Sequence, residues 1–429
     1  MSHDSDRGNL WLAAGLRTPF AKVDGALSAL DAIELSLPVA RSMLDVNGAQ
    51  IRPNLAIWGT VAPNLGYSNI AREILIDAEL DQTIPAFSTV MACSTSMIAV
   101  FEAASMLGTG GRNLALAGGV ESMSRIQVGL DQRLSDWLRR FFKARSLGQR
   151  LETFTELQFR DIKLFIPSVT SRSTGMSMGE HTEEMAKQWN IAREDQDELA
   201  LKSHEKAVTA QADGFFDSLI TPVGEVTADS LLRTDTSLER LASLKPVFDQ
   251  TSGRGTLTAG NSSPLTDGAA GIWVATDEGL SRLPDEIPHV RLLDWEIAGV
   301  DLGEEGLLMA PAYAIPRLLA RSRLTYEDID LWEIHEAFSA QVLCNVAALE
   351  SHDFLRKKVG VESEFGQFPW DRFNPKGGSV SIGHPFGATG ARILSQATKE
   401  LAAMSSGSRA VVSICADGGL GTVALLQAP

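Results

Sequence analysis

The sequence predicts an α/β fold, because short β-rich runs alternate with helical stretches along most of the chain. Residues 55–62 (LAIWGTVA) and 113–120 (NLALAGGV) have the composition of buried strands. Residues 95–107 (TSMIAVFEAASML), which lie between them, are expected to form an apolar helix. Because strands alternate with helices in this way, we expect mostly parallel sheets.

The C-terminal end of the chain repeats this order. Residues 387–404 (GATGARILSQATKELAAM) predict a helix opened by glycines, and residues 409–419 (RAVVSICADGG) predict a strand that ends in glycines. A helix, a strand and a glycine pair therefore occur in the same order at 95–119 and at 387–419. This repeat predicts two structurally related halves.

Length and charge limit the possible classes of protein. A chain of 429 residues is long for a single hydrophobic core, so we expect two or more domains. Hydrophobic residues make up 44% and charged residues 21%, which is ordinary for a globular protein. The formal net charge of −16 argues against nucleic acid as a partner, because binding to phosphates requires a basic surface.

The three cysteines, Cys93, Cys344 and Cys415, show no CxxC spacing, so we expect free thiols and no bound metal. Free thiols indicate a reducing, cytoplasmic compartment. The first residues lack the basic start and long apolar run of a secretory signal. No run of eighteen apolar residues exists, so we expect no membrane span.

A basic segment interrupts this anionic chain. Residues 131–163 contain eight Lys or Arg against five Asp or Glu. Apolar side chains recur at the spacing of one helical face from Leu134 to Phe142, and again after a break at Gly148. The segment fits a helix pair packed on its own core. It fits equally a docking surface for a partner subunit or an anionic membrane.

Cys93 lies in MACSTSM (91–97), directly before the predicted apolar helix. The positive potential of a helix N-terminus lowers the pKa of a thiol, which favours a nucleophile. The small neighbouring side chains leave space for a substrate. Taken alone, Cys93 also fits a buried structural cysteine, which is the more common situation for a free thiol.

Three further segments combine reactive side chains with glycines or strand ends. His384 lies in NPKGGSVSIGHPFGATGAR (374–392), where an imidazole can act as a base or a hydrogen-bond donor. Cys415 enters a glycine turn whose backbone N–H groups can bind an oxyanion. His335 follows a strand-like run and precedes a helix, a position that also fits a satisfied core histidine.

Together these segments resemble the thiolase family across nearly the whole chain. The closest resemblance is to the 3-ketoacyl-CoA thiolase β-subunits of fatty-acid oxidation (trifunctional) complexes. Two features point to these β-subunits: the histidine in HEAF, where most thiolases carry Asn, and the basic insertion 131–163. The matching motifs, in the family's order, are RTPFAK (17–22), GGVESMS (118–124), GNSSPLTDGAA (260–270), HEAF (335–338), GHPFGATGAR (383–392) and CADGGLG (415–421).

The resemblance implies a thiolase-like fold with two related βαβαβαββ-type halves and a five-layered αβαβα core. The first half would comprise residues 1–125 plus about 246–280. A loop domain, 126–245, would be inserted in it and carry the helical segment 131–163. The second half would comprise residues 281–429.

The resemblance also implies thiolytic cleavage of a 3-ketoacyl-CoA by CoA, the last step of fatty-acid β-oxidation, which is reversible as a Claisen condensation. Cys93 would carry the acyl group as a thioester, and His384 would be its base and part of an oxyanion hole. Cys415 would be the acid that protonates the acetyl-CoA enolate. His335 would hold an oxyanion-hole water or donate a hydrogen bond directly. The backbone N–H of Asp417 would complete a second oxyanion hole.

Ser263, Met178 and Phe338 match positions that contact CoA in the family. The resemblance implies CoA as a co-substrate, no permanently bound cofactor, and acyl-CoA substrates. It also implies a homodimer or homotetramer and a hydratase/dehydrogenase α-subunit as a partner.

Three other functions fit parts of the pattern. A short-chain acetoacetyl-CoA thiolase shares every catalytic residue. A ketoacyl synthase uses a Cys-His-His set but lacks the second cysteine, Cys415. A non-enzymatic scaffold is disfavoured because no member of the catalytic set is missing.

Overall fold

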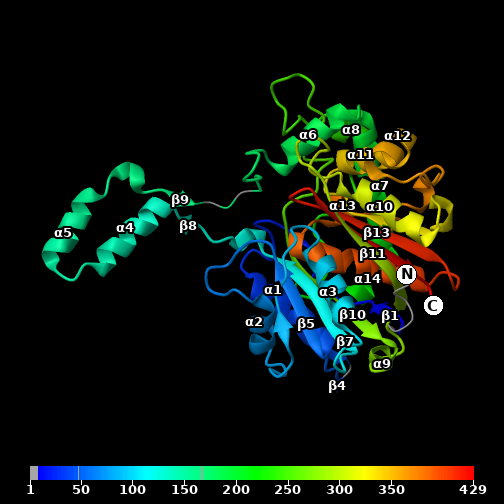
Figure 1. The fold of residues 1–429 in the computed structure, drawn as a ribbon, viewed down its shortest axis with the longest axis horizontal. Helices are drawn as coiled ribbons and strands as arrows, with labels where there is room; N and C mark the ends of the chain where they lie inside the picture. The colour runs from blue at the N-terminus through cyan, green and yellow to red at the C-terminus, as the bar shows by residue number, and fades with distance from the viewer. Residues whose placement is uncertain (1–7, 47, 166, 168) are drawn as a thin grey trace.

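The computed structural model describes residues 8–46, 48–165, 167 and 169–429 (Figure 1). Residues 1–7, which belong to the first predicted half, lie outside the described residues. No helix in the described part of the chain is both long and apolar enough to cross a membrane.

A ten-stranded sheet runs through the molecule. Its strands are hydrogen-bonded in the order β12-β13-β14-β11-β1-β10-β7-β5-β6, and β2 pairs with β10 beside this path. The predicted strands at 55–62, 113–120 and 409–419 are confirmed as β5, β7 and β13. The strands are β1 (Leu10–Ala13), β2 (Ala21–Lys22), β3 (Asp45–Val46), β4 (Ala49–Gln50), β5 (Leu55–Thr60), β6 (Ala86–Phe87), β7 (Leu114–Glu121), β8 (Gly129–Leu130), β9 (Leu164–Phe165), β10 (Thr266–Thr276), β11 (His289–Gly299), β12 (Leu331–Ile334), β13 (Arg409–Ala416) and β14 (Leu420–Gln427).

The sheet has two parts, one from each half of the chain. Helices cover the outer faces of both parts and fill the space between them (Figure 1). The predicted helices at 95–107 and 387–404 are confirmed as α3 and α14. The helices are α1 (Ala32–Leu44), α2 (Ile70–Asp77), α3 (Thr95–Met106), α4 (Gln132–Lys143), α5 (Leu147–Glu156), α6 (Met178–Gln188), α7 (Arg193–Ala212), α8 (Leu238–Ala242), α9 (Asp277–Leu280), α10 (Ala310–Ser322), α11 (Ser339–Leu349), α12 (His352–Phe354), α13 (Ser379–Ile382) and α14 (Thr389–Ala402).

The strand pairing confirms the two related halves. In the first half, β5 pairs with β7 in parallel, β7 with β10 antiparallel, and β10 with β1 antiparallel. In the second half, β12 pairs with β13 in parallel, β13 with β14 antiparallel, and β14 with β11 antiparallel. The same strand order therefore occurs twice, and the antiparallel pair β1–β11 joins the two parts.

The expectation of mostly parallel sheets is wrong, because antiparallel pairs outnumber parallel ones. Each half ends with a strand that returns antiparallel to its neighbour. In the second half this return is a tight hairpin, with Gly418 and Gly419 at φ +87° and +73° between β13 and β14. Such hairpins need no crossover helix, so helix–strand alternation alone does not predict them.

The layers stack as the family resemblance implies. Helices α1 and α2 pack on one outer face, α10 and α11 on the other, and α3 and α14 pack together in the middle. A Cβ on Gly390 of α14 would lie 2.4 Å from the backbone nitrogen of Met97 in α3, so this close approach requires glycine. The Ala391 N–H also donates to Ser96 Oγ at 2.8 Å. The central layer is therefore fixed by both packing and hydrogen bonding.

The basic segment forms a helical hairpin, α4 and α5, that projects away from the rest of the molecule (Figure 1). Trp137 stacks on Phe141 with ring centroids 5.4 Å apart and lies 6.4 Å from Phe154, so the two helices pack on each other. The predicted break between the two helices is present, but it lies at residues 144–146 and not at Gly148. Helix α5 begins one residue earlier, because Ser146 caps it through a capping box with Gln149.

Two buried carboxyl groups meet where α14 crosses β12. Gln396 Nε2 donates to both oxygens of Glu333, at 3.1 and 3.2 Å. Burial and the neighbouring Glu400 raise the pKa of Glu333 well above its usual range. Burial also raises the pKa of Glu400 to about 7. The Glu400 carboxyl therefore binds its proton more tightly in the folded state than in the unfolded chain. As the pH rises from about 4.5 to about 7, the free energy of unfolding falls.

We predict that Glu400→Gln stabilises the protein at pH 8 by on the order of 1–3 kcal/mol and flattens the pH dependence between about 4.5 and 7, because the buried charge is removed. Urea unfolding at pH 5 and pH 8 measures this difference. Glu205→Gln, at an exposed glutamate of α7, is the matched control. Equal stability changes in the two variants at pH 8 would contradict the account.

Candidate active site

Cys93 lies in a tight turn directly before the N-cap residue of α3, Ser94. The preceding residue, Ala92, has φ +45°, a left-handed conformation that is strained for a residue with a Cβ. Thr95 holds this turn, because its hydroxyl donates to the Ala92 carbonyl at 2.7 Å and accepts from the Met91 N–H at 2.9 Å. The turn therefore directs the Cys93 side chain from the start of α3, as the sequence predicts.

His384 lies in the glycine-rich loop before α14. Its backbone N–H donates to Thr266 Oγ1 at 3.0 Å, and Leu265 pairs with it in a parallel bridge. The buried Glu121 carboxylate accepts the Gly387 N–H at 3.1 Å and two backbone N–H groups of residues 61–62. This carboxylate ties the loop to the end of β7.

The imidazole of His384 faces the thiol of Cys93. Its Nε2 lies 3.1 Å from Cys93 Sγ, and its Nδ1 lies 2.7 Å from Thr389 Oγ1. The Thr389 hydroxyl donates to the Pro385 carbonyl at 3.0 Å, so its oxygen accepts from Nδ1–H. The proton therefore resides on Nδ1, and the Nε2 lone pair is free to accept the thiol proton.

Burial makes this pair neutral at rest. Burial, with a smaller effect of the Asp417 carboxylate, raises the pKa of Cys93 to about 12. Burial, with a smaller effect of the Arg392 guanidinium, lowers the pKa of His384 to about 3. The resting state is therefore a thiol hydrogen-bonded to a neutral imidazole. The gap between the two pKa values disfavours proton transfer from sulfur to nitrogen in the resting pair.

His335 lies beside His384, with ring centroids 4.2 Å apart. Its Nδ1 lies 2.8 Å from Ser379 Oγ, and Arg392 Nη2 donates to the same oxygen at 2.8 Å. Arg392 donates to Ser379, and His335 Nδ1 is the only acceptor within reach of the Ser379 hydroxyl proton among the described residues, so this proton points to His335 Nδ1. This leaves the His335 proton on Nε2. Burial, then the neighbouring His384 and Arg392, holds the pKa of His335 well below its usual range.

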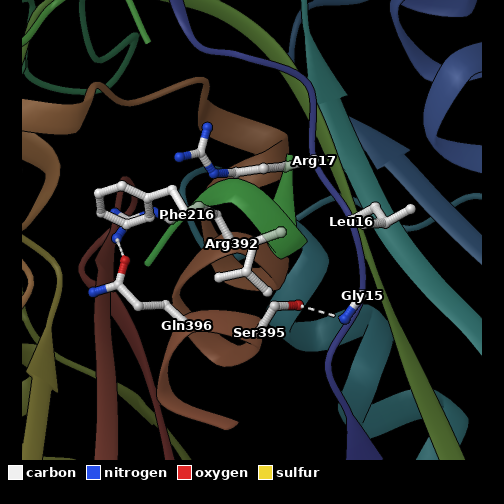
Figure 2. Close-up of a pocket in the computed structure, with 8 residues that line it drawn as sticks. Gly15, Leu16, Arg17, Phe216, Arg392, Ser395 and Gln396 are labelled. Carbon is white, nitrogen blue, oxygen red and sulfur yellow. Dashed lines mark hydrogen bonds between the residues drawn. The ribbon is translucent and has the colours of Figure 1, made fainter. Parts of the chain in front are cut away.

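Two buried arginines, Arg392 and Arg17, lie behind the two histidines. Arg392 lines a small cavity with Arg17, Phe216 and Gln396, which Figure 2 shows. Asp229 neutralises Arg17 through two hydrogen bonds of 2.6 and 2.7 Å. The Arg392 guanidinium therefore remains available to Ser379 and, through it, to His335.

The HEAF segment is held by its neighbours. Asn374 Oδ1 accepts the Ile334 N–H at 2.8 Å, and its Nδ2 donates to Glu336 Oε1 at 2.7 Å. Ser203 also donates to Glu336, at 2.7 Å. A Cβ on Gly378 would lie 2.2 Å from Glu336 Cδ, so the carboxylate fits only against glycine. Glu336 therefore anchors the segment that presents His335.

Cys415 is the penultimate residue of β13 and is buried. Burial, with the neighbouring Cys93, raises the pKa of Cys415 well above its usual range, so it is a protonated thiol. The next residue but one, Asp417, is exposed and its carboxylate accepts the Gly418 N–H at 2.7 Å. The field of this carboxylate acts on Cys93. Cys93, Cys344 and Cys415 are all free thiols, as predicted.

The three residues matched to CoA contacts lie near the HEAF segment. The Ser263 N–H donates to the Ala337 carbonyl at 3.0 Å. Met178 and Phe338 belong to one hydrophobic cluster. Phe248, which the sequence did not single out, packs edge-on to Phe338 with ring centroids 5.9 Å apart. Its ring also lies against Gly179, where a Cβ would come within 2.2 Å of the Phe248 ring.

The residues that orient the two histidines were also missed. Thr389 and Arg392 lie within the glycine-rich motif around His384, and Ser379 lies just before it. Their closeness to His384 in sequence was the only available signal. Their roles depend on which ring nitrogen each hydroxyl meets, and this requires the structure.

We predict that Thr389→Val slows alkylation of Cys93 by iodoacetamide on the order of 10–100-fold, because an unpaired Nδ1–H favours the tautomer that turns Nε2–H toward the thiol. Peptide mass spectrometry measures the rate. Thr398→Val is the control, since the buried Thr398 hydroxyl has no hydrogen-bond partner among the described residues. Thr389→Ser should retain the rate; equal slowing in all three variants would contradict the tautomer assignment.

Comparison with known protein families gives two matches that together span almost the whole chain. The family described as "Thiolase, N-terminal domain" matches residues 11–278. The family described as "Thiolase, C-terminal domain" matches residues 287–428.

Individual proteins agree with this result. The chain is 38% identical to a "3-ketoacyl-CoA thiolase" of Pseudoalteromonas translucida (strain TAC 125), over 97% of this chain and 96% of the relative. It is 36% identical to one of Yersinia enterocolitica, over the same shares.

Two solved structures share the fold. The Acat5 thiolase from Ascaris suum, in complex with coenzyme A, is 28% identical with a TM-score of 0.78, over 98% of this chain and 100% of that chain. The acetyl-CoA acetyltransferase of Bacillus anthracis is 29% identical with a TM-score of 0.79, over 99% and 100%. The sequence resemblance is thereby confirmed: the chain belongs to the thiolase family.

Proposed function

We propose that this thiolase-family acyltransferase cleaves a 3-ketoacyl-CoA with CoA, giving acetyl-CoA and an acyl-CoA shorter by two carbons. The observation that carries the proposal is the Cys93–His384 pair, in which a thiol faces the free Nε2 lone pair 3.1 Å away. Thiolysis needs a soft nucleophile that can hold the acyl group as a thioester, and a thiol with an adjacent base meets this need.

In the first step, Cys93 Sγ attacks the C3 carbonyl while His384 Nε2 takes the thiol proton. The C2–C3 bond then breaks, the acyl group stays on Cys93, and its electron pair moves to C2 as the acetyl-CoA enolate. Cys415, a protonated thiol next to Cys93, donates its proton to C2. After acetyl-CoA leaves, the proton on His384 returns to Cys415.

The developing negative charges need hydrogen-bond donors. The Nε2–H of His335 and the protonated Nε2 of His384 lie side by side and suit the oxygen of the acetyl-CoA thioester. The backbone N–H groups of Cys93 and Asp417 suit the oxygen at C3, since both contribute hydrogen bonds that favour the Cys93 thiolate. With its proton on Nε2, His335 acts as a direct donor in this proposal.

In the second step, neutral His384 takes the proton of incoming CoA. The CoA sulfur attacks the Cys93 thioester, and the Cys93 thiolate leaves and recovers the proton from His384. The same residues run the reverse condensation. CoA acts as a co-substrate and no permanently bound cofactor is needed. Met178, Phe338, Ser263 and the newly found Phe248 would line the approach to the thiol.

Relatives at 36–38% identity are named 3-ketoacyl-CoA thiolases, and they favour this substrate class over acetoacetyl-CoA alone. The solved structure named acetyl-CoA acetyltransferase is less similar, at 29% identity. A ketoacyl synthase is disfavoured, because that chemistry has no use for the second thiol, Cys415. The reaction fits the last step of fatty-acid β-oxidation.

We retain the division into a first half (1–125 with about 246–280), a loop domain (126–245) and a second half (281–429) as a proposal. A homodimer or homotetramer in the cytoplasm remains our expectation for the assembled enzyme.

We propose that the α4–α5 hairpin is a docking element. Its outer surface carries large apolar side chains together with a net charge of +3 over residues 131–163. This combination suits an anionic membrane surface, where apolar side chains insert and basic side chains meet lipid headgroups. A hydratase/dehydrogenase α-subunit is the other expected occupant. Within residues 131–163, the most exposed apolar residues are Phe142, Leu147, Leu151, Phe154 and Phe159.

For the catalytic proposal, we predict that Cys93→Ser abolishes the acyl adduct formed with a 3-ketoacyl-CoA, because a serine hydroxyl is a far poorer nucleophile than a thiol at neutral pH. Intact-protein mass spectrometry after incubation without free CoA measures the adduct. Cys344→Ser, at a buried cysteine of α11, is the matched control and should still be acylated. An adduct that persists on Cys93→Ser would refute the assignment.

For the docking proposal, we predict that the double variant Phe142→Glu/Phe159→Glu no longer sediments with phosphatidylglycerol vesicles but keeps thiolase activity. Met404→Glu, at an exposed apolar residue after α14, is the control. If the wild-type protein does not sediment with the vesicles, and the double variant no longer co-purifies with a hydratase/dehydrogenase subunit, the hairpin binds that subunit. If neither binding is affected, the hairpin is not a docking element.

A further inference from the structure

We infer that Cys93, His335 and His384 form a binding site for a soft divalent cation, Zn²⁺ above all, in the free enzyme. One ligand atom from each side chain lies within 4.8 Å of the others, and both histidines are buried. Thiolate and imidazole are the ligands that Zn²⁺ prefers, and two imidazoles with one thiolate leave a fourth position for water.

Histidines that bind metal in proteins almost always donate their other ring N–H to a hydrogen-bond acceptor. His384 already does so at rest, and His335 does so once its proton moves to Nδ1. Here Thr389 Oγ1 meets Nδ1 of His384 at 2.7 Å, and Ser379 Oγ meets Nδ1 of His335 at 2.8 Å. Both rings therefore present Nε2 to the space beside Cys93.

His335 Nε2 provides an independent indication. It is buried and has no hydrogen-bond partner among the described residues. A buried polar atom without a hydrogen-bond partner destabilises the fold, so it is rare in native structures. Its position next to a thiol and a second imidazole favours a ligand that bridges all three groups.

Small side-chain movements bring the three groups to zinc geometry. Bonds of about 2.0–2.1 Å to nitrogen and 2.3 Å to sulfur put tetrahedral ligand atoms roughly 3.4–3.6 Å apart. The Cys93 Sγ–His384 Nε2 distance of 3.1 Å would open slightly, and His335 would move inward. Cys93 releases its thiol proton to solvent, and the His335 proton moves from Nε2 to Nδ1, where Ser379 accepts it.

The consequence for the enzyme is reversible inhibition. The cation occupies Cys93 Sγ and His384 Nε2, the two atoms that acyl transfer needs. A Cys93 that already carries an acyl group has no free thiolate, so substrate protects the enzyme. The prediction that metal binds depends only on the geometry of the three side chains. The prediction that bound metal stops turnover also depends on the proposed thiolase function.

The expectation of no metal from the sequence is replaced by this proposal. The three ligands are separated by 242 and 49 positions along the chain, so no clamp spacing is visible. They meet only because the two halves place α3 and the loops before α11 and α14 side by side.

The test uses the full chain after EDTA treatment, with Co²⁺ as the spectroscopic probe and Zn²⁺ in calorimetry. We expect one equivalent of each metal to bind, a thiolate-to-cobalt absorption band, and displacement of Co²⁺ by Zn²⁺. Cys93→Ser should lose the band. His335→Asn should weaken Zn²⁺ binding by at least roughly 100-fold, since loss of an outer partner alone costs 10–100-fold. His352→Asn, at an exposed histidine, is the control.

Absence of the band, or equal Zn²⁺ affinity in wild type, Cys93→Ser and His335→Asn, would overturn the site. Inhibition adds a second, separable readout. An enzyme that shows the band but cleaves no 3-ketoacyl-CoA keeps the metal site and refutes the proposed function. If the enzyme is active, shows no cobalt band and turns over equally fast with Zn²⁺, the proposed function stands and the metal site is refuted.

Discussion

The hydrogen bonds from two hydroxyl groups to two buried imidazoles are the constraint on which the site depends. Thr389 fixes His384 with its Nε2 lone pair toward Cys93, and Ser379 fixes His335 with Nε2 toward the same space. Burial disfavours the charged forms of the thiol and both rings. The thiol and the two imidazole rings are therefore uncharged at rest.

The duplicated fold supplies these groups from both ends of the chain. The first half provides the strained turn with Cys93, and the second half provides His335, His384 and Cys415. Packing of α3 on α14 brings the turn and the glycine-rich loop together, and the Ala391–Ser96 hydrogen bond fixes their relative position. Neither half has a complete site. The two halves meet so closely that Gly390 has no room for a Cβ beside Met97.

Much of the fold could be predicted from the sequence, because helix and strand periodicity and the repeated helix–strand–glycine order are local signals. The antiparallel pairs were missed, since they depend on which distant strands meet. Cys93, His384 and Cys415 could be singled out because each lies in an unusual glycine or small-residue context. Thr389, Ser379 and Phe248 could not, because a hydroxyl or an aromatic ring gains its role only from the partner it meets in space.

The protonation state of His384 decides whether its Nε2 can accept the proton of Cys93. Nitrogen-15 NMR of the free enzyme, labelled at histidine, distinguishes a neutral ring with its proton on Nδ1 from the other tautomer and from an imidazolium. We expect His384 to carry its proton on Nδ1 and to stay neutral from pH 8 down to pH 5, because burial lowers its pKa to about 3. An imidazolium at pH 7, or a proton on Nε2 facing the thiol, would contradict this expectation.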